Sequence, residues 1–420
     1  MLRRNFIQTF GAATVGATLL PAATRTGKKV RVAAVVTAYY RDSHADVIVS
    51  RMAGGYFADL KLVEPHCKIV SMFVAQQPDP NGGGARSDLS RASAEKYDFK
   101  LYSTIAGALK QGGKSLDVDA VLLIGEHGEY PSNDIGQRLY PRFEFFQAVL
   151  AVFREAGAVR PVFFDKHLSY SWEQAKAMYD SARQLRIPIM AGSSIYVSAR
   201  IPALSLPLDT ALEYAVGTGR PAGEGWGGTG LETYAFHALE AFQTMVERRR
   251  PGETGLRSVQ TLNDDAVWNW AEGDGAWSKP LLSAALDAAR ASERTVPQLR
   301  RSRAAVFILE YRDGFKGAIY MPTRGPTCFA AKLAGQDAPV ATFFTNHRIE
   351  SKYPHFDALT HQIEEFFVSG VSPRPLERNL LVSGALEALL RSRKSEQRIL
   401  TPELAIQYRA PAKDYFVRLN

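Results

Sequence analysis

The residues best placed to do chemistry surround a lysine near the middle of the chain. Asp165, Lys166 and His167 follow a short apolar run at 161–164, which predicts a strand ending just before them. A helical stretch and a second apolar run at 187–191 come next, so the segment is expected to form a βαβ unit. Ligands of open α/β sheets sit at the carboxyl ends of the strands. Lys166 is therefore our strongest candidate for proton transfer at a bound substrate.

A second polar cluster follows the apolar run at 119–124, which is typical of a buried parallel strand. It consists of Glu126, His127 and Glu129, and together with Asp165 and His167 it could bind a sugar, a proton or a divalent metal. The alternative is a loop whose polarity reflects only its turn chemistry. The chain contains neither Cys-x-x-Cys nor His-Glu-x-x-His, so no standard zinc pattern is present and no metal site is assigned.

Two further histidines are candidates. His237 lies on an expected helix among apolar residues, where a histidine is either a base or a hydrogen-bonded core group. His44 follows the first expected strand, 30–37, and is a candidate for contact with a ligand at the end of that strand.

Composition excludes several classes of partner. The 420 residues carry a net charge of +8, but the basic runs at 248–250 and 300–301 lack interleaved aromatic residues, so no nucleic-acid partner is expected. After the N-terminal leader no stretch approaches the roughly 20 apolar residues of a membrane span. Cys67 and Cys328 are expected to be independent buried thiols.

Residues 1–26 are expected to be an export signal. Arg3 and Arg4 precede a weakly hydrophobic stretch rich in glycine, alanine and threonine, which resembles a twin-arginine signal. An ordinary secretory signal and a retained membrane anchor are the alternatives. The expectation is a periplasmic or secreted protein that uses the twin-arginine export machinery. Because that route carries folded proteins, it hints at a cofactor inserted before export.

The remaining chain divides into two expected domains. In 27–194, strands and helices alternate, which predicts a Rossmann-like, doubly wound parallel sheet. In 195–420, longer alternating strands at 256–262, 304–311, 317–321 and 340–345 predict an α+β domain with an open, mostly antiparallel sheet and helices on one face. The sequence Tyr311-Arg-Asp-Gly-Phe315 predicts a hairpin turn.

These elements resemble, in order, the glucose-fructose oxidoreductase/inositol dehydrogenase family, Gfo/Idh/MocA. Asp165-Lys166-His167 is similar to the family's Glu-Lys-Pro motif, and the segment 227–240 is similar to its Gly-Gly stretch followed by Asp-x-x-x-His-x-x-Asp. The segment from 363 to 390 resembles the family's closing region. The resemblance covers about Val30 to Arg398, nearly all of the mature chain.

The resemblance implies an oxidoreductase that uses NAD or NADP on a sugar or polyol. It implies catalytic roles for Lys166, His237 and His127. The residues that it places beside the cofactor are Thr37, Ala38, His44, Glu126 and Lys166. It also implies a homo-oligomer, because the open sheet face of such proteins often forms a dimer interface.

The departures from the family pattern fall on functional positions. Val36, Ala38 and Arg41 stand where the family has the glycines that let a pyrophosphate approach the backbone. No acidic residue ends the second strand, and Thr233 replaces the aspartate that would orient His237. A Gly-x-Gly-x-x-Gly pattern does occur at 223–228, but it follows no strand of the nucleotide-binding half and overlaps the Gly-Gly stretch.

These departures leave two alternatives to a dehydrogenase. In the first, dinucleotide binding is lost and the same cleft serves an NAD-independent carbohydrate lyase or hydrolase, which Glu126, His127, Asp165 and His167 could assist with a metal. In the second, the protein only binds a carbohydrate. Fold analogy alone does not decide among the three.

Overall fold

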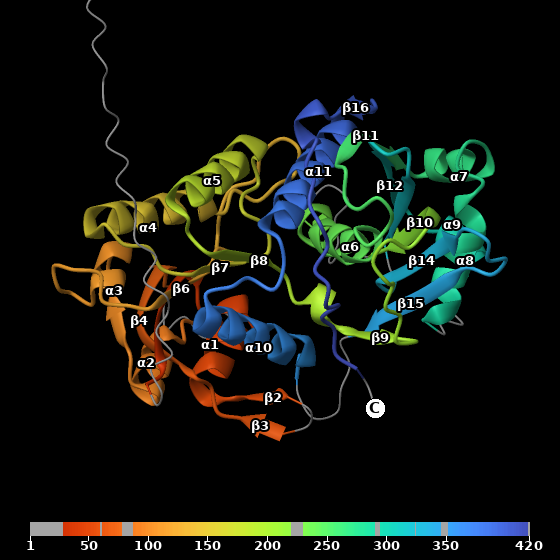
Figure 1. Cartoon of the computed structure of the whole chain (residues 1–420). Coiled ribbons are helices and arrows are strands. Elements are labelled where there is room, and N and C mark those ends of the chain that lie inside the picture. The colour runs from red at the N-terminus through yellow and green to blue at the C-terminus, as the bar shows by residue number, and fades with distance from the viewer. Residues whose placement is uncertain are drawn as a thin grey trace, which may run out of the picture.

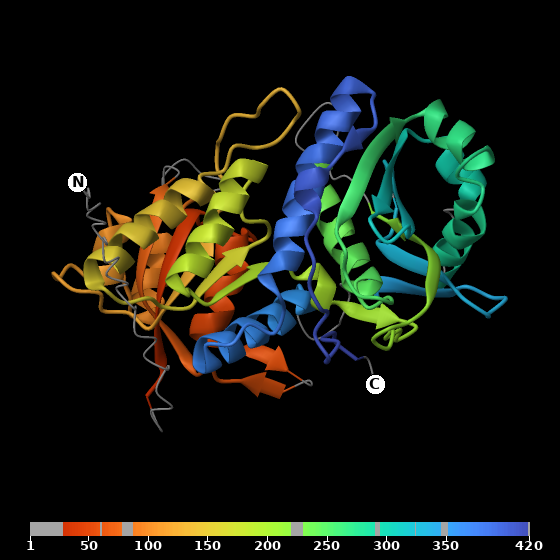
Figure 2. The same cartoon turned by 45° about the horizontal axis from the view of Figure 1, so that its top comes forward.

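The structure, a computed structural model, describes residues 28–58, 61–77, 87–219, 230–289, 295–323, 325–345 and 352–418. The expected export signal at 1–26 and the glycine-rich stretch at 223–228 lie outside the described residues. Two sheets, each covered by helices, lie side by side, and helix α11 (Leu376–Ser395) runs between them (Figures 1 and 2). The site is built where the two halves meet.

The first sheet is six-stranded and parallel, with the order β5-β4-β1-β6-β7-β8. Its strands are β1 (Val30–Ala38), β4 (Cys67–Gln76), β5 (Lys100–Tyr102), β6 (Ala120–Ile124), β7 (Val162–Asp165) and β8 (Ile189–Gly192). The helices of this half are α1 (His44–Gly54), α2 (Ser90–Tyr97), α3 (Ile105–Lys110), α4 (Arg142–Ala156) and α5 (Trp172–Leu185). A small hairpin, β2 (Tyr56–Ala58) and β3 (Lys61–Val63), follows α1.

Strand β1 is apolar on both faces because both faces of this sheet are covered. Val32, Ala34 and Val36 join a core with α1 and with α10 (Pro354–Ser369), which returns from the second half of the chain. Ala33 and Val35 join a core with α3, α4 and α5. A central strand of a parallel sheet has this continuous apolar character. The predicted Rossmann-like fold is confirmed.

The second sheet is eight-stranded, with the order β16-β11-β12-β13-β10-β14-β15-β9. It is antiparallel except for the pair β10–β13, as predicted for a mostly antiparallel sheet. Its strands are β9 (Ala199–Ile201), β10 (Leu212–Thr218), β11 (Leu256–Asn263), β12 (Ala304–Tyr311), β13 (Lys316–Pro322), β14 (Cys328–Leu333), β15 (Val340–Thr345) and β16 (Ile399–Leu400). The other elements are α6 (Gly230–Val246), α7 (Asp265–Glu272), α8 (Ser278–Ala288), α9 (Val296–Arg300) and the 3-10 turns η1 (Ile195–Val197) and η2 (Pro402–Leu404).

The expectation that helices cover one face of this sheet is wrong. Phe307 on β12 packs in the core formed with α6 and α11, whereas its neighbour Val306 packs in the core formed with α7, α8 and α9. Strands buried on both faces lack the polar, solvated face of a sheet that helices cover on one side only. The expected homo-oligomer requires an exposed face of this sheet, but helices of the same chain cover both faces.

Smaller expectations also have outcomes. Strands β12 and β13 form the predicted hairpin, and Gly314 supplies the positive φ of its turn, at 90°. Cys67 and Cys328 are buried free thiols, as predicted. Within the described ranges, no helix combines the length and the apolar character needed to cross a membrane.

Candidate active site

Lys166 lies directly after β7, with a left-handed backbone φ of 65°. Its N–H donates to the carbonyl of Gly192 at 3.1 Å, and its own carbonyl accepts from the Asn379 side chain at 2.8 Å. A non-glycine residue with positive φ is uncommon, and such strain collects at functional sites. The fold thus holds Lys166 in place from β8 and from α11.

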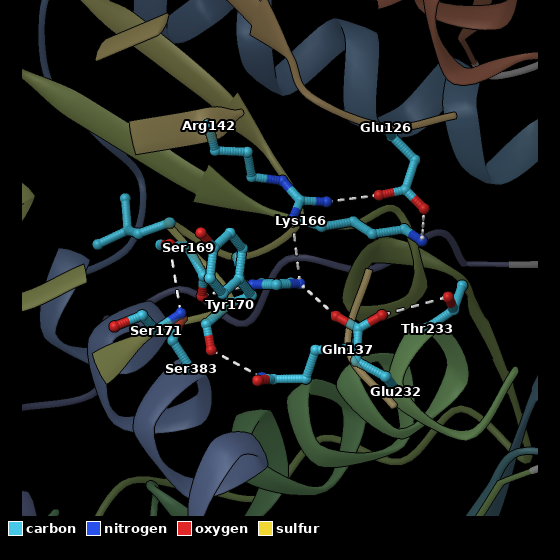
Figure 3. A network of polar contacts seen from close by, with 12 residues as sticks. Glu126, Gln137, Arg142, Lys166, Ser169, Tyr170, Ser171, Glu232, Thr233 and Ser383 are labelled. Atoms are coloured by element: carbon cyan, nitrogen blue, oxygen red, sulfur yellow. Dashed lines mark hydrogen bonds and ion pairs between the residues drawn. The ribbon is translucent and has the colours of Figure 1, made fainter. Parts of the chain in front are cut away.

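The ammonium of Lys166 pairs with Glu126, which follows β6. Its Nζ lies 2.7 Å from Oε1 of Glu126, and Arg142 Nη2 lies 2.5 Å from the other carboxylate oxygen. Figure 3 shows the two cations on one carboxylate, and all three side chains are buried. Burial raises the pKa of Glu126, but Lys166 and Arg142 outweigh it and hold the pKa well below its usual range.

His167 continues this buried network toward the second half of the chain. Its Nδ1 donates to the carbonyl of Ser169 at 2.7 Å. Its Nε2 lies 3.3 Å from Nη1 of Arg142 and 3.0 Å from the Glu232 carboxylate on α6. The network thus runs from Lys166 through Glu126, Arg142 and His167 to Glu232. Among the described residues, no group of three or more His, Cys, Asp and Glu side chains is arranged to hold a metal ion.

Sequence reasoning missed Arg142 and Glu232. Arg142 opens helix α4, and its guanidinium is 1% exposed, which is rare for arginine. Arg142 belongs to no motif, and Glu232 lies within the segment 227–240 but at none of the positions that match the family pattern. Each meets its partner only through the tertiary fold. The sequence carried no signal that could have identified them.

His44, at the start of α1, forms a separate pair with Asp165, at the end of β7. The His44 Nδ1 lies 2.6 Å from Oδ2 of Asp165. Backbone N–H of His44 donates to Nδ1 of His127 at 3.3 Å, and the two imidazole rings meet edge to face at 5.0 Å. The structure thus brings together the ends of β1, β6 and β7, as the βαβ argument predicts. Asp165 and His127, which we grouped as potential metal ligands, instead contact the same histidine.

His127 is held neutral. Burial and, next, the electrostatic effect of the neighbouring His44 lower its pKa to about 3. Its φ of 71° is left-handed, like that of Lys166. A neutral imidazole that accepts at Nδ1 carries its proton on Nε2.

His237 lies on α6, on the other side of the site. Its Nδ1 is 2.9 Å from the hydroxyl of Ser193, and that hydroxyl donates to Glu240 at 2.5 Å. Burial and then the charge of Lys166 lower the pKa of His237 well below its usual value. Ser193 rather than a carboxylate is the partner of His237, which fits the loss of the aspartate at Thr233.

The residues expected beside a cofactor are engaged within the chain. Thr37 is fully buried and donates its hydroxyl to the carbonyl of Glu126 at 2.6 Å, and Ala38 is also buried. The N-cap Ser43 accepts from the N–H of Asp46 through its side chain at 3.1 Å, while the N–H of His44 is bound by His127. Asp46 also puts a carboxylate in the first turn of α1.

A hydrogen-bonded bridge closes the carboxyl end of β1. The Gln76 side chain, at the end of β4, donates to the carbonyl of Glu129 at 2.8 Å and accepts from its N–H at 2.7 Å. Strand β1 lies between β4 and β6, so the bridge crosses its end. A pyrophosphate needs free N–H groups at the start of α1, and an acid there repels it. The residues present do not fit a bound dinucleotide.

Comparisons with known proteins bear on the fold. No protein-family model matches the chain, and no curated protein matches its sequence. Solved structures do match over nearly the whole chain. GenD2 from gentamicin A biosynthesis, solved with NAD, is 13% identical with a TM-score of 0.55, covering 91% of this chain and 99% of that chain. The myo-inositol dehydrogenase of Lactobacillus casei, solved with NAD(H) and myo-inositol, is 13% identical with a TM-score of 0.55, covering 89% and 96%. A myo-inositol dehydrogenase of Corynebacterium glutamicum is 13% identical with a TM-score of 0.52, covering 89% and 98%.

At this identity the likeness shows the fold alone. The chain has the fold of the inositol dehydrogenases, a Rossmann-like half followed by a mixed-sheet half. Lys166, Glu126 and His127 meet at the carboxyl edge of the parallel sheet, with His44, and His237 faces them from α6.

Proposed function

We propose that this chain is an exported Gfo/Idh/MocA-type enzyme that acts on a sugar or polyol. The observation that carries the proposal is the position of Lys166, at the carboxyl end of β7 in the fold of the inositol dehydrogenases. One neighbour with this fold was solved with myo-inositol bound. The twin-arginine pattern at residues 1–26 supports export to the periplasm or beyond the cell.

The first candidate reaction is oxidation or reduction of the sugar or polyol with NAD or NADP. The whole-length likeness to proteins solved with NAD supports it, and so does an export route that carries folded proteins. In that reaction a nicotinamide cofactor supplies the hydride chemistry. Lys166 and His237 would hold and move the hydroxyl proton.

The second candidate is an NAD-independent reaction on a carbohydrate at the same group of residues. The connection between β1 and α1 favours it, because Ser43 and His127 occupy the N–H groups that a pyrophosphate would use. The bridge between Gln76 and Glu129 favours it as well. Of the two reactions, this one agrees with the geometry around α1.

Cofactor content distinguishes the candidates. The full chain is expressed in the cytoplasm, purified and denatured, and the supernatant is analysed for NAD(P) by absorbance and mass. The native protein is then titrated with NADH and NADPH by calorimetry. From the geometry we expect no released dinucleotide and no binding heat. Stoichiometric NAD(P) would contradict the second candidate and establish the first.

A further inference from the structure

We propose that His44 and Asp165 form a general-base dyad, in which Nε2 of His44 takes a proton from a carbon beside a substrate carbonyl. The inference rests on the second candidate above, an NAD-independent reaction on a carbohydrate. Asp165 is the positioning residue, and His44 is the residue that touches the substrate.

The contact between the two residues fixes the protonation pattern of His44. Its Nδ1 lies 2.6 Å from Oδ2 of Asp165, whose side chain is 0% exposed, while the histidine side chain is 15% exposed. A carboxylate can only accept, so Nδ1 carries a proton, and Nε2 is the nitrogen left to exchange one with a substrate. The rings of His127 and Phe356 pack edge to face at 5.0 Å and 5.1 Å and hold the imidazole plane.

Asp165 depends on this contact. Among the residues that the structure describes, its second oxygen, Oδ1, has no hydrogen-bond partner. A buried carboxylate with so little solvation is stabilised strongly by a neighbouring cation. Its negative charge therefore lies where it stabilises the positive charge that develops on the His44 ring during proton transfer.

The other histidines of the site are less suited to the role. His127 stays neutral, with its pKa lowered to about 3 by burial, and its Nδ1 is bound by the His44 backbone. His237 faces a serine, and His167 has a carboxylate partner but is 2% exposed. His44 alone, among these described histidines, combines partial exposure with a buried carboxylate. Thr233 stands where an aspartate would orient His237. The pair of His44 with Asp165 takes the place of that missing carboxylate–histidine pair.

The chemical step needs no oxidant. The C–H bond beside the carbonyl breaks, its proton bonds to Nε2 of His44, and the electron pair moves into an enolate. Lys166 would stabilise the enolate oxygen once its buried pair with Glu126 opens toward the substrate. In D₂O the Nε2–H of the imidazolium exchanges with solvent, and return of a deuteron from Nε2 to the carbon restores the ketone with deuterium in place of hydrogen.

Deuterium exchange tests the dyad. Dinucleotide-free protein is incubated in D₂O with 2-keto-myo-inositol and with a panel of keto-sugars, and incorporation beside the carbonyl is followed by NMR. General-base catalysis typically contributes about 10²–10⁴-fold, so we expect His44→Gln to lose at least about 100-fold in exchange rate. Imidazole added to His44→Ala should restore part of the rate. His66→Gln, an exposed histidine outside the site, is the control with an unchanged rate.

Asp165 requires a readout that a purely structural role would not change. The long-range ¹H–¹⁵N spectrum of the wild type should show His44 with its proton on Nδ1. In Asp165→Asn we expect this signature to change and the exchange rate to fall at least tenfold, while the circular dichroism spectrum stays that of the wild type.

The outcomes separate the dyad from the proposed function. Exchange by the wild type that persists in His44→Gln overturns the dyad and leaves the NAD-independent function standing. Absence of exchange by the wild type, with every member of the panel, also overturns the dyad, while the NAD-independent function is tested separately by the cofactor content described above. Loss in both variants with imidazole rescue supports both.

Discussion

At the scale of single residues, the ammonium of Lys166 is shielded by its own partner. Its side chain is 3% exposed and that of Glu126 is 5% exposed, with 2.7 Å between the charged atoms. A substrate can reach Nζ only if this pair opens or if Glu126 turns toward Arg142 alone. The partly exposed groups that line the site are instead His44, His127 and His237. Histidines, rather than the lysine, are the groups that an incoming molecule would meet first.

His127 should make the protein sensitive to acid. Its pKa is about 3 in the folded chain, against about 6.5 for a histidine in an unfolded one. Between these values the unfolded state binds more protons, so stability falls as the pH decreases from about 6.5 toward 3. We expect His127→Gln to flatten this dependence, by up to about 1.4 kcal/mol per pH unit. Urea denaturation at a series of pH values measures it.

The matched control for that series is His66→Gln, because His66 is an exposed histidine. Its replacement should leave the slope of stability against pH unchanged. His127 faces His44, Glu126, Lys166 and Asp165, all of which contribute to its charge environment. A wild-type slope retained in His127→Gln would show that one of these neighbours, and not His127, carries the acid sensitivity.

At the scale of elements, three segments of the chain come close together at the end of β8. Gly192 has a φ of 140°, and a Cβ there would lie 2.2 Å from the Glu240 carboxylate and 2.8 Å from the Arg374 guanidinium. Gly192 also accepts the N–H of Lys166. We expect Gly192→Ala to destabilise the protein by about 2–4 kcal/mol, because both the backbone and buried charged groups must shift. Urea denaturation measures the loss.

Gly335 provides the comparison for that substitution. Its φ is also positive, at 75°, but no atom lies within 4 Å of a Cβ built there. Gly335→Ala should therefore lower the free energy of unfolding by only roughly 1 kcal/mol, the cost of placing an alanine at a positive φ. If the two alanine variants lose the same stability, the contact with Glu240 and Arg374 does not constrain β8.

The sequence predicted the elements whose pattern is local. Continuous apolar runs identified the strands of the parallel sheet, and the Asp-Gly pair identified the turn between β12 and β13. The sequence reading missed β10, both of whose partners lie far along the chain, and β14, one of whose partners does. It also missed the short helices α7 and α9. It also did not reveal that β12 is buried on both faces, because this depends on what packs against it.

The sequence predicted several residues of the candidate site but not which of them contact one another. Strand ends identified Lys166, Glu126 and His127, because each follows an apolar run. The pairing of His44 with Asp165 spans 121 positions, and that of Arg142 with His167 joins a helix start to a strand end. Spacing in a sequence carries no information on such contacts unless a motif records them.

At the scale of the whole molecule, α11 joins the two halves and is buried along most of its length (Figure 2). Asn379 bonds the backbone of Lys166 and Leu168 in the first half, and Glu387 accepts from the N–H of Trp172 at 2.5 Å. The preceding residue, Arg378, bonds Glu247, which directly follows α6, through Nε at 2.7 Å. The helix that holds the site lysine is thus itself held by the second half.

This linkage predicts that both halves unfold together. Arg378 is 5% exposed and Glu247 is 1% exposed, so Glu247→Leu leaves a buried guanidinium without its carboxylate. Breaking such a pair costs about 3–5 kcal/mol. In calorimetry we expect one transition, shifted down by several degrees as a whole. Asp180→Asn, which removes an exposed pair with Lys176 on α5, should cost about 0.5 kcal/mol or less. Two separate transitions, of which Glu247→Leu shifts only one, would mean that α11 does not couple the halves and that the position of Lys166 is set by the parallel sheet alone.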